Sequence, residues 1–191
     1  MKFSKITTLA KRNKTAVLMQ DGDGQQWLST GSAVYRLENM PLLDEDTVLT
    51  VMGVPDDKRE KWLARCEDEP RRFLKNDLPD EEEITAEDAG ISVIYAGSLL
   101  TPIYTLDGVI WLDTELLAPT VKKEDGYKRY FIRNMGKQRA IAVKDGMLLS
   151  ALILEYIQEG TSLFEAVDTL ADRCRAELRR PKMEEYSDQE E

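Results

Sequence analysis

The 191-residue chain contains no histidine, only two cysteines and no long apolar run. Without histidine it cannot build a Ser-His-Asp triad, a histidine-ligated metal site or an imidazole general base. Two cysteines cannot supply a disulfide framework, and a chain of this length buries enough surface to fold without one. No apolar run approaches the roughly 18 residues of a membrane span, and the opening MKFSKITTLAKRNK lacks the apolar stretch of a secretory signal. We therefore expect a cytoplasmic protein with no membrane contact.

Motifs for catalysis, metals and cofactors are missing as well. Cys66 and Cys174 lie in segments predicted to be helical, where a buried, inert thiol is the usual role. The segment from Asp21 to Gly24 has two acids of a calcium loop but lacks the third, so it predicts a hairpin turn. The acidic run from Asp80 to Glu83 has the oxygens that Mg²⁺ prefers, but consecutive acids without flanking strands usually form a solvated loop. We therefore expect no enzymatic activity, no cofactor and no metal site.

Charge is unevenly distributed along the chain. With 36 acidic and 26 basic residues the formal net charge is −10, which argues against indiscriminate binding to nucleic acid. The basic residues gather in two segments, which contain Lys2, Lys5, Lys11, Arg12 and Lys14, and then Lys122, Lys123, Lys128, Arg129, Arg133, Lys137 and Arg139. The acidic excess lies around residues 77–88 and 184–191. Two interpretations stay open, a solvated surface without function and a functional basic face.

Hydrophobic spacing predicts an α+β fold, mainly antiparallel sheet built from two β-meander units with short helices. The first unit, residues 1–55, is expected to contain a helix over residues 3–13, strands over 15–20, 25–29 and 32–37, and a short helix that ends at Gly53. Turns such as Thr30-Gly31 supply the backbone freedom that antiparallel hairpins require. Residues 56–90 are expected to form a helical and acidic insertion or linker, in which a helix covers residues 56–69.

The second unit, residues 91–160, is expected to be rich in strands. The predicted strands are 91–96, 101–106, 109–113, 127–134, 139–144 and 147–156, with a brief helix over 114–121. Ser162 and Glu165 form a capping box that begins a C-terminal helix, residues 161–180. Its apolar stripe, expected to dock against the rest of the chain, consists of Leu163, Val167, Leu170, Ala171, Cys174 and Leu178. Residues 181–191 are expected to form a disordered acidic tail.

One predicted strand combines aromatic and basic side chains. Alternation along residues 127–134 puts Arg129, Phe131 and Arg133 on the same face. Such a face resembles a platform on which nucleic-acid bases stack. The competing interpretation is an ordinary half-buried strand, because aromatic residues beside basic ones are common there.

The order of elements resembles that of DNA sliding clamps. From Val109 to Tyr156 the chain runs strand, short helix and three antiparallel strands, ending in AIAVKDGMLLSALILEY, which is similar to the repeating unit of those processivity factors. The segment MKFSKITTLAKRNKTAVLM, followed by two more strands, looks like a second such unit. The insertion at residues 56–90 and the helix after Ser162 have no counterpart in a minimal clamp unit. In its general composition the chain also resembles uncharacterised proteins of bacterial prophages.

The resemblance implies a non-catalytic accessory protein that touches double-stranded DNA without sequence preference. The residues that it implies at phosphates are Lys5, Lys11, Arg12, Lys14, Lys122 and Lys123, with Lys2 beside them. A single chain of this length cannot encircle a duplex, so a homo-oligomer or a replication or phage protein is expected as partner. The alternative is a protein-interaction or regulatory module that uses the C-terminal helix and does not bind DNA.

Overall fold

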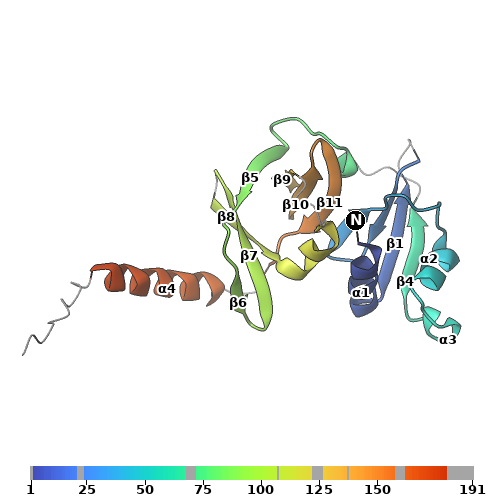
Figure 1. Ribbon diagram of the computed structural model, residues 1–191, viewed down its shortest axis with the longest axis horizontal. Helices are drawn as coiled ribbons and strands as arrows, with labels where there is room; N and C mark the ends of the chain where they lie inside the picture. The colour runs from blue at the N-terminus through green and yellow to red at the C-terminus, as the bar shows by residue number, and fades with distance from the viewer. Residues whose placement is uncertain are drawn as a thin grey trace, which may run out of the picture. The chain divides into compact units, whose positions relative to one another are not determined.

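The computed structural model describes residues 2–20, 24–67, 72–106, 108–121, 127–136, 138–157 and 162–179. The chain divides into two compact units, residues 1–156 and 157–191. The first unit contains the whole sheet, and the second contains the helix α4 (Ser162–Arg179) (Figure 1). The predicted α+β fold with a mainly antiparallel sheet and a C-terminal helix is confirmed.

A single eleven-stranded sheet organises the first unit. The strands are β1 (Thr15–Gln20), β2 (Gln26–Ser29), β3 (Ala33–Arg36), β4 (Leu63–Glu67), β5 (Glu83–Asp88), β6 (Val93–Tyr95), β7 (Ser98–Thr105), β8 (Gly108–Asp113), β9 (Lys128–Asn134), β10 (Arg139–Asp145) and β11 (Leu148–Leu154). Their order is β4-β1-β2-β3-β11-β10-β9-β5-β7-β6, and β8 pairs with β7. Only the β1–β4 pair among them is parallel. The two meander units share this sheet because β3 pairs with β11, where Tyr35 faces Ala151.

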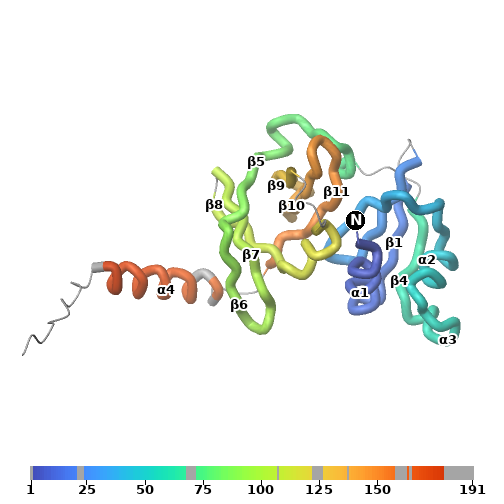
Figure 2. The backbone as a smooth tube through the Cα atoms, viewed as in Figure 1, coloured from blue at the N-terminus to red at the C-terminus, as the bar shows by residue number. Residues whose placement is uncertain are grey.

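Short helices join and cover the strands. They are α1 (Phe3–Asn13), α2 (Glu45–Val51), α3 (Asp56–Arg59) and the 3₁₀ helices η1 (Arg72–Leu74) and η2 (Thr114–Thr120). The first of these helices forms as predicted, with Ile6, Leu9 and Ala10 buried. It ends at Lys14, whose left-handed backbone (φ 49°) closes the last turn. Figure 2 traces the chain from α1 directly into β1.

The two faces of the sheet carry separate apolar clusters. In β1, Ala16 and Leu18 pack in the larger cluster together with the buried face of α1. Val17 and Met19 point the other way, because side chains alternate along a strand, and pack in a smaller cluster with Leu74 of η1. The segment 72–77, here called the strap, therefore covers the face of the sheet opposite to α1.

The segment between the two meanders differs from its prediction. The helix predicted for residues 56–69 is wrong beyond Arg59, because residues 63–67 form the edge strand β4. Its helix-forming side chains are overruled by pairing with β1, which begins where the Leu63 amide donates to the Lys14 carbonyl at 2.8 Å. Residues 83–88, expected in the linker, form β5, which pairs with β9 and then with β7.

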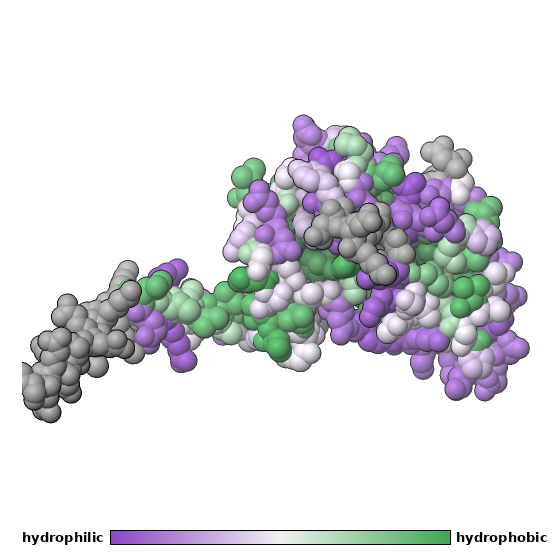
Figure 3. Space-filling view, viewed as in Figure 1, coloured by the Kyte–Doolittle hydropathy of each residue, from purple (hydrophilic) through white to green (hydrophobic). Residues whose placement is uncertain are grey.

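The C-terminal helix α4 forms within one residue of its predicted bounds. In its apolar stripe Leu163 is buried, whereas Leu170 is 55% exposed and Leu178 is 86% exposed. Cys66 and Cys174, both expected to be buried, are exposed. Figure 3 shows apolar surface, in green, along this helix. The predicted disordered tail, residues 181–191, lies outside the described residues.

Candidate nucleic-acid interface

The exposed side of α1 carries basic residues and no acidic ones. Because Ile6, Leu9 and Ala10 take the buried side of the helix, Lys5, Lys11 and Arg12 extend to solvent, as does Lys14 at its end. All four residues predicted in this segment are thus accessible to a ligand. The last turn contains Lys11 and Arg12, where positive charge also stabilises the carboxyl end of the helix dipole.

These residues do not form a single row. Successive side chains on a helix are about 100° apart, so Lys5 and Arg12, seven positions apart, share one flank of α1. Lys11 lies on the other flank. A Cβ atom added to Gly53 would lie 3.8 Å from the Lys11 Nζ atom, which shows that Lys11 reaches the turn between α2 and α3. A ligand that contacts Lys5 and Lys11 together would have to lie across the helix.

Arg12 has fixed acidic partners. Its guanidinium donates to the Glu115 carboxylate at 2.5 Å and lies 3.8 Å from the Asp113 carboxylate. Both acids lie at the start of η2, more than 100 positions along the chain, so the sequence pattern could not reveal the pairing. Arg12 therefore joins α1 to η2, and the cations that remain for a ligand on this helix are chiefly lysines.

The beginning of α1 is held against the end of η2. The backbone amide of Lys2 donates to the Pro119 carbonyl at 3.0 Å, which fixes the beginning of α1 against the end of η2. A second bond holds η2 from the sheet side, since the Tyr35 hydroxyl donates to the Leu116 carbonyl at 2.8 Å. Burial raises the pKa of Tyr35 far above its ordinary range, so this hydroxyl stays a donor. Lys122 and Lys123, which follow η2 in the sequence, lie outside the described residues.

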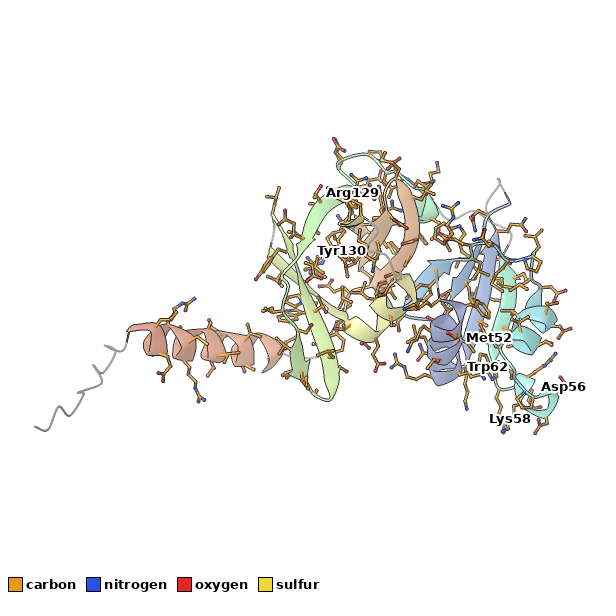
Figure 4. The ribbon with its side chains drawn as sticks, viewed as in Figure 1. Met52, Asp56, Lys58, Trp62, Arg129 and Tyr130 are labelled. Atoms are coloured by element: carbon orange, nitrogen blue, oxygen red, sulfur yellow. The ribbon has the colours of Figure 1, made fainter. Side chains whose placement is uncertain are left out.

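The fold adds two basic residues that the sequence reasoning did not consider. Lys58 and Lys61 are exposed, and the bond from the Leu63 amide to the Lys14 carbonyl brings their segment to the end of α1. Figure 4 shows Lys58 beside Asp56 at α3, with Trp62 nearer to α1. Acidic residues lie beside Lys58 and Lys61 in the sequence, so these two lysines add little net positive charge to the surface near α1. Because a helix is predicted across this segment, the sequence does not indicate that the segment lies near α1.

The second basic segment does not form an open stacking platform. Arg129, Phe131 and Arg133 do share a face of β9, as alternation predicts, and the Arg129 guanidinium lies 5.4 Å from the Phe131 ring centre. However, Lys144 lies over the same ring at 4.4 Å, and the side chain of Arg133 is fully buried. The ring therefore packs against structural cations under the strap and is not free for bases. Figure 4 shows Arg129 and Tyr130 on this strand.

Arg133 belongs to a buried ion cluster. Its guanidinium donates to one oxygen of Glu83, at 2.5 and 2.8 Å, and to the carbonyls of Phe73, Lys75 and Asn76 in the strap, at 2.6 to 3.0 Å. Lys144 donates to the other Glu83 oxygen at 2.7 Å and to Asp77 at 2.9 Å. Both Glu83 oxygens are thus occupied by cations, so the structure uses this carboxylate to hold β5 and the strap against the sheet.

Three comparisons, with protein-family models, with curated proteins and with solved structures, find no match for this chain. Among the residues that the structure describes, no helix combines the length and the apolarity needed to cross a bilayer. Within those same residues, no three histidine, cysteine or acidic side chains are grouped to hold a metal ion.

Replacing Glu83 with glutamine should destabilise the first unit by about 3 kcal/mol, because it leaves two buried cations without their shared anion. The matched control is Glu87→Gln on the same strand, where the side chain is exposed and the cost should stay below about 0.5 kcal/mol. Urea unfolding followed by tryptophan fluorescence measures both. Equal midpoints for the two variants would contradict the structural role of the cluster.

The Asp77 carboxylate makes part of this stability dependent on pH. The hydrogen bond and the positive charge of Lys144 lower the pKa of Asp77 below its ordinary value. A pKa that is lower in the folded than in the unfolded state stabilises the fold at pH values above the unfolded-state pKa of about 4. That contribution disappears as the pH falls through the folded-state pKa. Asp77→Asn should therefore lower stability at neutral pH, and the difference from wild type should shrink in acid. The matched control is Asp80→Asn, at an exposed neighbouring position; a gap for Asp77→Asn that persists in acid would contradict the assignment.

Proposed function

We propose that this chain is a non-catalytic, clamp-like accessory protein that associates with duplex DNA through the exposed side of α1. The observation that carries the proposal is that Lys5, Lys11 and Lys14 extend to solvent from a segment without any acidic residue.

The charge distribution determines what kind of binding this is. Lysine ammonium groups contact phosphates as point charges and do not read base edges, so the association has no sequence preference. Each neutralised phosphate releases condensed counterions, which makes the affinity fall as salt rises. The net charge of −10 repels DNA from the rest of the surface. Binding by one chain is therefore weak, orientated by α1 and sensitive to salt.

The order of elements in the first unit agrees with the clamp-like proposal. A strand, a short helix and three antiparallel strands follow one another as β8, η2, β9, β10 and β11. The helices α1 and η2 pack on the same face of the sheet, where they are in contact. This arrangement supports a layer of helices that faces DNA and is backed by a sheet, which is the arrangement that the resemblance to sliding clamps implies.

The proposal predicts a specific change in salt dependence. Lys5→Gln, Lys11→Gln and Lys14→Gln should each weaken binding to a short duplex of any sequence, and each should lower the slope of log affinity against log salt by about one. Fluorescence anisotropy over a series of salt concentrations measures the slope.

The matched control is Lys75→Gln in the strap, which removes the same charge from the opposite face of the sheet. Its side chain is exposed, so the fold should not change. Lys75→Gln should leave the slope as in wild type. If all four variants lower the affinity equally, net charge rather than the α1 surface governs the interaction, and the proposal fails.

A second candidate function is a protein-interaction module without DNA binding. The observation in its favour is the apolar stripe of α4, in which Leu170 is 55% exposed and Leu178 is 86% exposed. Helices of this length gain most of their stability from packing an apolar face, so the stripe fits contact with another surface. Loss of α4 would abolish such an interaction and leave the α1 surface intact.

A further inference from the structure

The exposed stripe of α4 has a spacing that is the same in both directions. Val167, Leu170, Ala171 and Cys174 follow one another at intervals of three, one and three residues. When a second copy of the helix is reversed, Leu170 can face Ala171 of that copy and Val167 can face its Cys174. A surface that is complementary to itself in this way fits the twofold symmetry of a homodimer.

The charges beside the stripe have the same symmetry. Asp168 and Arg175 are seven positions apart and therefore lie on one flank of the helix. In a reversed pair this flank meets the same flank of the second copy, so each Asp168 lies within about 3 Å, along the axis, of the Arg175 of the other copy. Two symmetric attractions result. In the single chain Arg175 contacts Asp172 at 2.7 Å, and both side chains are more than 60% exposed, so Arg175 can be shared.

A parallel pair would lack this complementarity. With both copies in register, the flank that carries Arg175 meets the flank that carries Arg173 and Glu177. Arg175 would then lie between one like charge and one opposite charge, which offset each other. The two Cys174 residues would also meet in the interface. Charge therefore favours the reversed arrangement.

We propose that α4 is a homodimerisation helix whose exposed stripe packs antiparallel against the same stripe of a second copy of this chain. Ala171 lies at the centre of the contact, where its small side chain lets the two helices approach closely. The contact covers the stretch from Val167 to Cys174, because in this register Leu178 would face Leu163 of the other copy, which is already buried. Dimerisation by α4 does not require α1 to bind DNA.

Sedimentation equilibrium of the full chain tests the contact itself. The wild-type chain should show a reversible monomer–dimer equilibrium, and Leu170→Asp should weaken it by more than about 100-fold, because a charge would be buried in the interface. Thr169→Asp, an exposed neighbour on the opposite side of the helix, is the matched control and should dimerise as wild type. A wild-type chain that stays monomeric at all concentrations, or a Leu170→Asp chain that dimerises normally, would overturn the proposal.

A charge exchange tests the orientation. Asp168→Arg and Arg175→Asp should each weaken self-association by about tenfold, because each puts like charges opposite one another. An equimolar mixture of the two variants should regain it. In the mixed dimer the arginine introduced at position 168 meets the aspartate introduced at position 175, and the unchanged Arg175 of one chain meets the unchanged Asp168 of the other. A mixture that associates no better than either variant alone would contradict the antiparallel pairing.

Oxidative cross-linking gives an independent readout of the same geometry. In a Cys66→Ser background, the reversed register holds the two Cys174 residues about 10 Å apart along the axis, beyond the reach of a disulfide. Oxidation should therefore leave this chain uncross-linked, whereas adding Val167→Cys should yield a covalent dimer through residues 167 and 174. Efficient cross-linking through Cys174 alone would show a parallel pair and overturn the antiparallel assignment.

Discussion

The contact of Glu83 with Arg133 and Lys144 is the interaction on which the first unit depends most. The Glu83 carboxylate on β5 accepts from Arg133 on β9 and from Lys144 on β10. The same Arg133 donates to carbonyls of the strap, so this cluster joins three separate parts of the chain. Burying these charges costs free energy, and the geometry repays that cost only because nearly every donor has a partner. The strap can cover the second face of the sheet because its carbonyls are held by Arg133 and its single carboxylate, Asp77, is held by Lys144.

The cations of the chain fall into two groups by their surroundings. Arg12, Arg133 and Lys144 are held in ion pairs that join segments distant in the sequence. Lys5 and Lys11 extend from α1 to solvent. A flexible ammonium suits contact with a phosphate backbone without sequence preference, so the second group is the one that the DNA proposal uses.

Much of the fold could be predicted from local patterns. The helix α1, the hairpin strands β1 to β3 and the strands β9 to β11 follow from apolar spacing and from turn glycines such as Gly31 and Gly146, both of which have positive φ. The edge strand β4 and the strand β5 could not, because each is fixed by pairing with a strand that is distant in the sequence. The exposure of Lys5 and Lys11 followed from the helical pattern, but the acidic partners of Arg12 and the burial of Arg133 depend on residues 50 or more positions away.

The two proposals, for α1 and for α4, are connected by effective concentration. A dimer joined through α4 would carry two basic helices, and a second contact with the same duplex would then form at a high effective concentration.

The most direct test of the DNA proposal is a nuclear magnetic resonance titration of the isotope-labelled chain with a short duplex at low salt. The account predicts that amide signals of α1 and η2 shift together while those of the strap stay in place. Shifts confined to other surfaces, or no shifts at all, would contradict it.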